Sequence, residues 1–344
     1  MRDLWYAIYD FIDVFLSKYG KDIQKSVLPY FVACGILFLF VAELQIIGWF
    51  VKANGKGDAC SAEAQTQAET AVAPDALKEK GDLPDRYDAH AAMEDGIFWM
   101  LGDRSSVYSI YFLRPDEDAS PFIFQSRPTQ PASMIKLFVL AKGMQDVKDG
   151  RLTLEETLKL QAKDIANGAG VLTRYDVGKR IHIRRLMELM IAESDNTATN
   201  VLIEKIGMEE IERYIQEHGY QDTHLRHKMM IRGKGKNSSS ARDIGTLLTK
   251  IYRYECVGES EDKLMIRMMK EQTDQECFPK ALPGWTVAHK TGEVSGSYAD
   301  GGICFGKKGD FILVTMCEDY TGRNEAVRDM RRLASWFASS VHEK

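Results

Sequence analysis

The order of secondary-structure signals after residue 84 is the feature that most restricts the fold of this chain. Two strand-like runs come first, at 107–113 and 122–125, and a long helical region covers about 133–248. Three more strand-like runs follow, with the sequences WTVAHKT, GGICFG and DFILVTMC. Helices are predicted at 88–101 and 324–341. Strands at both ends with helices between them predict one antiparallel sheet built from both ends of the domain, plus a helical subdomain.

Residues 27–51 (VLPYFVACGILFLFVAELQIIGWFV) form an apolar run that is long enough to cross a hydrocarbon core of about 30 Å. Aromatic residues lie near both of its ends, where amphipathic rings favour the headgroup level. A buried helix of a soluble domain is the alternative interpretation. The excess of lysine and arginine before the run places residues 1–26 in the cytoplasm. We therefore expect a single-pass protein of the cell membrane, with the bilayer as one partner and an extracytoplasmic C-terminal domain.

The segment 52–84 is rich in alanine, glycine, glutamine and glutamate and contains no aromatic residue, which is typical of a flexible linker. The folded domain is then predicted over 85–344, long enough to bury a full core. The whole chain of 344 residues has 45 basic and 50 acidic residues. This mild net charge of −5 does not indicate a nucleic-acid partner.

The six cysteines are widely spaced, without a C-x-x-C pair or a cysteine and histidine cluster at metal-ligand spacing. The sequence therefore predicts no structural metal and no cofactor. Cys256 and Cys277 could form a disulfide in an oxidising compartment, but in so large a domain we expect buried free thiols.

Three short motifs that carry chemistry occur in the predicted domain. At average composition, S-x-x-K occurs about once in a chain of this length, whereas S-D-N and K-T-G each occur in about one chain in twenty. Their joint presence is therefore a specific signal. In chain order, they are Ser133-Met134-Ile135-Lys136, Ser194-Asp195-Asn196 and Lys290-Thr291-Gly292.

The first motif predicts an activated nucleophile. Ser133 opens an apolar predicted helix, where its hydroxyl lies at the positive end of the helix dipole, and Lys136 lies three residues further on the same face. A lysine among apolar neighbours is costly to bury as a cation, so it can accept a proton. Taken alone, the motif could also be a helix-capping serine followed by a surface lysine.

The other two motifs have structural alternatives as well. Ser194-Asp195-Asn196 lies between two predicted helices and could simply cap the second one. Alternation along the predicted strand puts His289 on the opposite face from Lys290, so we expect His289 to be structural. The chain contains no G-x-S-x-G motif, which argues against a Ser-His-Asp hydrolase.

With these motifs in this order, the chain resembles the class A β-lactamase family of penicillin-recognising serine hydrolases. The resemblance runs from about residue 85 to the C-terminus and includes MIAESDNTATNVLIEKIG and AHKTGEVSG. It implies an antiparallel five-stranded sheet flanked by helices plus an all-α lobe, with the active site in the cleft between them. It also implies that the substrates are β-lactams or D-Ala-D-Ala-like peptides of peptidoglycan.

The resemblance implies the following catalytic roles. Ser133 would attack a carbonyl and form an acyl-enzyme, and Lys136 would accept or relay the proton. Ser194 would pass that proton to the leaving nitrogen. The backbone N–H groups of Ser133 and Glu293 would form the oxyanion hole.

Roles in substrate binding are implied in the same way. Asn196 would hydrogen-bond the amide side chain of the substrate, and Lys290 and Thr291 would hold its carboxylate. Gly292 would let the strand approach the substrate closely.

Two departures from the family pattern affect the predicted activity. In class A β-lactamases, a glutamate in a loop after the second motif activates the deacylating water, but the matching segment here, LRHKMMIRGKGKNSSSARD, has no carboxylate before Asp243. This absence favours a D,D-peptidase of the cell wall or a non-turnover penicillin-binding sensor as alternatives to a β-lactamase. The segment is also basic, which could attract an acidic polymer but is more typical of a solvated face.

The second departure concerns the substrate carboxylate. The family often has an arginine assisting Lys290, but no arginine occurs between Lys290 and Arg323. The hydroxyl groups of Ser297 or Tyr298 are candidates to replace it.

Overall fold

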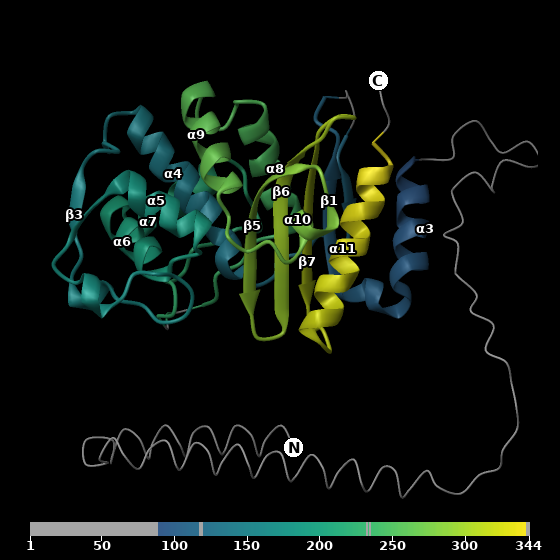
Figure 1. Cartoon of the computed structure of the whole chain (residues 1–344), viewed down its shortest axis with the longest axis horizontal. Helices are drawn as coiled ribbons and strands as arrows, with labels where there is room; N and C mark the ends of the chain where they lie inside the picture. Colours follow the sequence, from purple (N-terminus) through teal and green to yellow (C-terminus); the bar gives the residue numbers. More distant parts are fainter. Residues whose placement is uncertain (1–88, 117–119, 232, 234, 342–344) are drawn as a thin grey trace, which may run out of the picture. The chain divides into compact units, whose positions relative to one another are not determined.

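The computed structural model describes residues 89–116, 120–231, 233 and 235–341 (Figure 1). The predicted cytoplasmic segment 1–26, membrane span 27–51 and linker 52–84 lie outside the described residues. Within the part of the chain that is described, no helix is long and apolar enough to span a bilayer.

A five-stranded antiparallel sheet forms the centre of the domain, with strand order β2-β1-β7-β6-β5. Its two N-terminal strands pair with three from the C-terminal part, which confirms the predicted sheet built from both ends. Most positions along β1 and β7 are buried, because helices cover both faces, and this explains their continuous apolar sequences. The strand bounds are β1 Tyr108–Leu113, β2 Phe122–Phe124, β5 Thr286–Val294, β6 Ser297–Phe305 and β7 Phe311–Glu318.

One face of the sheet is covered by the two terminal helices of the described chain, α3 (Ala89–Leu101) and α11 (Arg323–Ser339), together with the short α10 (Phe278–Ala281) (Figure 1). A core cluster joins them to the sheet through residues such as Phe112 and Phe337, whose rings stack at 4.5 Å. This layer is the one predicted from the helical patterns at the two ends of the domain.

The other face of the sheet packs against an all-α lobe, and one large apolar cluster runs through both (Figure 1). The predicted class A β-lactamase-like architecture of sheet, flanking helices and helical lobe is therefore present. The helices of this part are α4 (Lys136–Lys148), α5 (Ile183–Ala192), α6 (Asn196–Ile206), α7 (Met208–Glu217), α8 (Ala241–Tyr252) and α9 (Glu259–Lys270).

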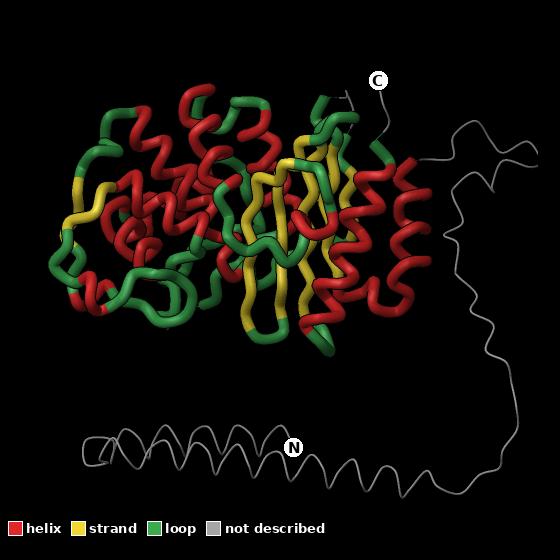
Figure 2. The backbone as a smooth tube through the Cα atoms, viewed as in Figure 1, coloured by secondary structure: helices red, strands yellow, loops and turns green. Residues whose placement is uncertain are grey.

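The region predicted to be mainly helical, about 133–248, also contains strands and 3-10 turns (Figure 2). A two-stranded ribbon pairs β3 (Thr157–Lys159) with β4 (Arg180–His182). Each of these strands has three residues, too few to produce a periodic sequence signal. Short 3-10 turns interrupt the chain at η2 (Gly102–Val107), η3 (Ala132–Ile135), η4 (Ala162–Asp164) and η5 (Arg174–Asp176).

Candidate active site

Ser133 lies on the 3-10 turn η3, where the chain enters α4, and its side chain is half-buried. The Met134 amide donates to the Pro131 carbonyl at 2.9 Å, a three-residue spacing that closes a 3-10 turn. The α-helix predicted to open at Ser133 therefore begins three residues later, at Lys136. The serine remains in the turn that leads into the helix, directly before its N-terminus.

Lys136 is fully buried in the first turn of α4. Its Nζ atom donates to the Ser194 carbonyl at 2.6 Å and to the Asn196 Oδ1 atom at 2.8 Å. Burial lowers the pKa of Lys136 well below its ordinary value, the neighbouring Lys290 lowers it further, and Asp195 opposes the shift. The amine can therefore lose its proton at lower pH than an exposed lysine, as general-base chemistry requires.

Ser194 connects α5 to α6 in a left-handed conformation, with φ at 52°. This conformation is uncommon for a residue other than glycine and occurs often at functional sites. The Ser194 Oγ atom lies 3.0 Å from the Lys290 Nζ atom and 3.4 Å from the Lys136 Nζ atom. The fold thus places one hydroxyl between two buried amines that come from the other two motifs.

Asp195 holds the second motif in place. One of its carboxylate oxygens accepts from the Ala198 amide at 2.7 Å and so caps α6. The other accepts from the amides of Val171 and Leu172, at 2.7 and 2.8 Å. The capping role considered from the sequence is therefore real, and the same carboxylate also fixes the neighbouring loop.

Asn196 forms part of the cavity wall next to this loop. Its Oδ1 atom accepts from Lys136, and its Nδ2 atom donates to the Asn167 carbonyl at 2.9 Å. A Cβ atom on Gly168 would lie 2.9 Å from that Nδ2 atom, so the loop packs closely over the amide. These contacts fix the orientation of the Asn196 side chain at the cavity.

Lys290 is fully buried on β5, and its Nζ atom also donates to the Thr291 carbonyl at 2.8 Å. Burial lowers the pKa of Lys290 to about 7, against the opposing effect of the carboxylates of Asp274 and Asp300. Near neutral pH, this amine can therefore carry the positive charge needed to bind an anion. A small rise in pH is enough to remove that charge.

Gly292 brings β5 against the turn that carries Ser133. A Cβ atom at this position would lie 2.7 Å from the Pro131 carbonyl oxygen and 3.2 Å from the Met134 backbone nitrogen. Real Cβ atoms essentially never approach other atoms to 2.7 Å. The glycine therefore sets the distance between the strand and the nucleophile turn.

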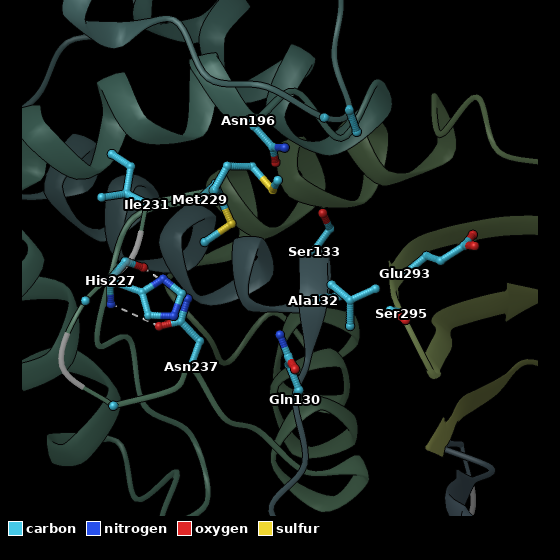
Figure 3. Close-up of a pocket in the computed structure, with 16 residues that line it drawn as sticks. Gln130, Ala132, Ser133, Asn196, His227, Met229, Ile231, Asn237, Glu293 and Ser295 are labelled. Atoms are coloured by element: carbon cyan, nitrogen blue, oxygen red, sulfur yellow. Dashed lines mark hydrogen bonds between the residues drawn. The ribbon is translucent and has the colours of Figure 1, made fainter. Parts of the chain in front are cut away.

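Glu293 follows on β5 with a half-exposed carboxylate, and both of its oxygens accept from the Arg323 Nε atom at 2.9 Å. In Figure 3, the Glu293 carboxylate points away from Ser133. Arg323 begins α11, and its guanidinium lies 5.3 Å from the centre of the Tyr298 ring. An arginine therefore does lie beside the C-terminal end of β5, although it comes from a distant part of the chain.

The structure does not support either candidate substitute for the missing arginine. Tyr298 packs in the core cluster on the α11 side of the sheet, and its buried hydroxyl has no hydrogen-bond partner. Ser297 donates to the Gln130 carbonyl at 3.4 Å. The hydroxyl side chain that lines the cavity at this end is instead that of Ser295.

His289 is buried on the α11 side of the sheet, with its Nδ1 atom 2.8 Å from the Asp300 Oδ1 atom. Lys290, the next residue on the strand, contacts Ser194 on the opposite face. The structure thus agrees with the interpretation of His289 as a structural histidine.

A cavity of about 800 Å³ opens beside Ser133 (Figure 3). The loop after α7 forms one of its walls and contributes the side chains of His227, Met229, Met230 and Ile231. Among the described residues that line the cavity, Glu293 supplies the single carboxylate. The absence of an acid between Asp222 and Asp243, noted in the sequence, therefore corresponds to a wall without a carboxylate beside the serine.

Asn200 fixes the position of this wall. Its Oδ1 atom accepts from the Met229 amide at 2.7 Å, and its Nδ2 atom donates to the Met229 carbonyl at 3.0 Å. Met229 is almost fully buried. Asn200 thus holds the backbone of a methionine, and not of an acidic residue, at this part of the cavity wall.

Two of the basic residues of this loop have acidic partners. Lys228 forms an ion pair with Glu204, and the Arg226 Nη1 atom lies 3.4 Å from the Glu212 Oε1 atom. The pKa of Glu204 is lowered by its hydrogen bond to Lys228. These pairs favour the solvated-face interpretation for this part of the loop.

Comparison with known proteins supplies the decisive observation. A family model described as Beta-lactamase2, beta-lactamase enzyme family, matches residues 97–338, which is most of the chain. The chain belongs to the beta-lactamase enzyme family. As a member of this family, it is a serine hydrolase with an acyl-enzyme mechanism.

Individual members of the beta-lactamase family are distantly related to the chain. It is 27% identical to beta-lactamase BRO-1 of Moraxella catarrhalis over 175 residues, 48% of this chain and 55% of BRO-1. The match thus spans about half the length of that relative. A beta-lactamase of Bacillus licheniformis is 25% identical over 251 residues, 69% of this chain and 77% of that protein.

Among solved structures, PBP-A superimposes with a TM-score of 0.66 and 26% identity, covering 72% of this chain and 95% of PBP-A. An L158E mutant of PBP-A has been solved as an acyl-enzyme complex with penicillin G. These similarities agree with the class A fold described above.

Sequence reasoning missed several residues that shape this site of the beta-lactamase-family chain. Asn200 and Arg323 act through contacts to Met229 and Glu293, which are distant in the sequence and belong to no local motif. Asn200 did have one usable signal, since it lies on the predicted helix that directly follows the second motif.

Proposed function

We propose that the chain hydrolyses or captures β-lactam and D-Ala-D-Ala-like amides through an acyl-enzyme on Ser133. The observation that carries this proposal is the position of the Ser194 hydroxyl between the buried amines of Lys136 and Lys290, at a cavity bordered by Ser133. The neutral amine of Lys136 can pass a proton through the Ser194 hydroxyl to a leaving nitrogen. The cationic amine of Lys290 can bind a carboxylate of the substrate beside that nitrogen.

Acylation would proceed by addition to the carbonyl and then elimination of the leaving nitrogen. The Ser133 Oγ atom forms a bond to the carbonyl carbon, and its proton passes to the neutral Lys136 amine. The carbonyl oxygen becomes negative in the tetrahedral intermediate and is held by the backbone N–H groups of Ser133 and Glu293. When the carbon–nitrogen bond breaks, Ser194 donates a proton to the leaving nitrogen and is reprotonated from Lys136.

The substrate would be oriented by groups already fixed in the apo site. Lys290 and Thr291 would bind the carboxylate of the substrate, and Asn196 would bind the amide of its side chain. Arg323 is engaged by Glu293, so it would assist carboxylate binding only if that ion pair opened. The main electrostatic contribution is therefore assigned to Lys290.

Deacylation would be slow, because the loop that forms the cavity wall supplies methionine and isoleucine in place of an acid. General-base activation of a water typically contributes about 10²–10⁴-fold. This wall favours a D,D-peptidase or a penicillin-binding sensor over an efficient β-lactamase. A sensor acts by staying acylated, whereas a D,D-peptidase would be inhibited by a long-lived β-lactam adduct, because the adduct occupies the serine that attacks its peptide substrate.

The location of the domain forms a second part of the proposal. The apolar run 27–51 supports a single membrane anchor, and the composition of 52–84 supports a tether between this anchor and the hydrolase domain. The domain would then face the cell wall, where peptidoglycan peptides occur.

Variants of the first motif test the proposed chemistry. Ser133→Ala should abolish covalent labelling by a fluorescent penicillin, because the labelled oxygen is gone. Lys136→Ala should slow labelling without unfolding the protein, because it removes a proton acceptor. Retained labelling of Ser133→Ala would place the nucleophile elsewhere, and a normal rate in Lys136→Ala would refute the role of the lysine.

A further inference from the structure

A second pocket, of about 460 Å³, lies beside α9 at the end of the sheet that is remote from the active site. Glu293 of β5 lines the active-site cavity, whereas Phe305 of β6, which lines this second pocket, pairs with Thr286 at the other end of β5. In Figure 1, α9 lies at the upper end of β5 and β6, and the turn between these two strands lies at their lower end. This α9 pocket is therefore separate from the cavity at Ser133.

One wall of the α9 pocket is positively charged. Lys263, Arg267 and Lys270 line it from one face of α9, at positions i, i+4 and i+7, and all three side chains are exposed. Lys263 forms an ion pair with Glu259 at 2.5 Å. Within the described part of the chain, neither Arg267 nor Lys270 forms an ion pair. Two cations thus line the pocket without a carboxylate partner.

Aromatic rings form much of the remaining wall. Tyr252, at the end of α8, stacks on Phe305 with the ring centres 6.2 Å apart. The Lys270 Nζ atom lies 4.4 Å from the centre of the Phe305 ring, and such cation–π contacts keep an ammonium group close to a ring face. Tyr254 has a left-handed φ of 60° and is 41% exposed, so its ring adds open aromatic surface to the pocket.

Asp310 supplies the single carboxylate among the described residues that line the α9 pocket. One of its oxygens accepts from the Tyr252 hydroxyl at 3.0 Å, and the other accepts from the Gly306 amide at 3.1 Å. A carboxylate has about four lone-pair positions, so Asp310 can accept further hydrogen bonds from hydroxyl groups of a ligand. Its charge disfavours a ligand with closely spaced phosphates. The pocket therefore suits a molecule with hydroxyl groups at one side and well-separated anionic groups at the other.

We propose that the α9 pocket binds a carboxylated glycan chain. Carboxylates of the chain would pair with Arg267 and Lys270, and sugar hydroxyl groups would donate to Asp310. The C–H groups on the flat side of a sugar ring would pack on Tyr254, because the face of an aromatic ring is electron-rich. The volume of the pocket lies in the range of sites for small ligands.

The position of the α9 pocket gives this binding a role. A glycan held at this end of the sheet would leave the cavity at Ser133 free for a peptide, so the pocket would keep the domain on wall polymer during the reaction. This role rests on the proposed function, whereas glycan binding itself does not depend on it.

Three hexamers that differ in charge and in sugar content provide the test. Hexagalacturonate is a sugar chain with a carboxylate on every ring, chitohexaose is an uncharged sugar chain, and hexaglutamate carries carboxylates without sugar rings. Binding to the full-length protein in detergent is measured by isothermal titration calorimetry at low salt, where charged contacts are least screened. We expect hexagalacturonate to bind at least about tenfold more tightly than either of the other two, a difference of about 1.4 kcal/mol.

A double variant, Arg267→Gln with Lys270→Gln, tests the pocket itself. It should weaken hexagalacturonate binding about tenfold or more, because both unpaired cations are lost. Lys159→Gln with Arg174→Gln is the matched control, since it removes the same charge from two exposed side chains that form no ion pair in the described part of the chain and lie outside the pocket. Its affinity should stay within about twofold of the wild-type value. Labelling of Ser133 by penicillin should be the same in both double variants.

The outcomes separate this inference from the proposed function. Equal binding of hexaglutamate and hexagalacturonate by the wild-type protein would reduce the pocket to a charged surface and overturn the inference, and this comparison needs no variant. Equal binding of chitohexaose, or equal losses in the two double variants, would overturn it as well. If no penicillin modifies Ser133, the proposed function fails, but selective binding of hexagalacturonate would still support the pocket as a glycan site.

Discussion

The Nζ atom of Lys290 lies 3.0 Å from the Oγ atom of Ser194, so the second and third motifs meet in one hydrogen bond. Burial lowers the pKa of Lys290 to about 7, and Lys290 in turn contributes to the lowered pKa of Lys136. The two amines therefore share the site in a way that makes the reaction sensitive to pH. One has to be neutral to accept a proton, and the other has to be charged to bind a carboxylate.

The pH dependence of acylation should follow from these two requirements. A lysine is neutral above its pKa, so the acylation rate constant of the free enzyme should rise with pH as Lys136 loses its proton. It should fall again as pH rises through about 7, where Lys290 loses its charge. In Lys290→Arg, the cation persists to high pH, so the alkaline fall should disappear. An alkaline fall at the same pH in this variant would show that another group causes it.

Gly292→Ala should damage both the fold and the reaction. The added Cβ atom would lie 2.7 Å from the Pro131 carbonyl, so β5 would have to move away from the Ser133 turn. We expect a loss of about 1–3 kcal/mol in the free energy of unfolding, as for other overpacked positions, and slower labelling by penicillin. Denaturant unfolding measures the first effect. Gly322→Ala is the control, because a Cβ atom there meets nothing within 4 Å, and comparable losses in both variants would contradict the account.

The sequence predicted the sheet, its flanking helices and the reactive motifs, because apolar runs and short motifs are local signals. It did not predict the ribbon of β3 and β4, whose strands are too short to show a period. It also placed the helix start at Ser133, because the pattern of apolar residues cannot distinguish a 3-10 turn from the first turn of an α-helix.

The parts of the site that escaped prediction depend on tertiary contacts. The sequence showed that no carboxylate lies between Asp222 and Asp243, but it could not show that Asn200 holds Met229 in the cavity. The link from Arg323 to Glu293 likewise requires the start of α11 to lie beside the end of β5. Tyr298 was considered as a substrate-binding residue because of its position in the sequence, whereas strand alternation turns it into the core.

Met229→Glu should convert the slow second step into a faster one. Asn200 holds the backbone of this residue, so the new carboxylate would lie in the cavity beside Ser133. We expect steady-state turnover of benzylpenicillin to rise by roughly 10²-fold. Ile231→Glu is the matched control, because its side chain is half-exposed on the same wall. An equal gain in both variants, or no gain in folded Met229→Glu, would argue against the assigned position of the missing base.

The membrane anchor is tested by cell fractionation. Full-length protein should remain in the membrane fraction after a carbonate wash, because the run 27–51 would be embedded in the hydrocarbon core. A chain that starts at Asp85 should be soluble and react with penicillin like the full-length protein. Release of full-length protein by carbonate alone would contradict the anchor.

The most direct test of the account is the time course of intact mass after mixing the protein with excess benzylpenicillin. The absence of a carboxylate from the loop wall beside Ser133 predicts a burst of one adduct per chain, located on Ser133 by peptide mapping, followed by slow release and slow steady-state turnover. Ser133→Ala should show no adduct. Fast multiple turnover by the wild-type protein without an accumulated adduct would contradict the account, since it would require an efficient base for the deacylating water.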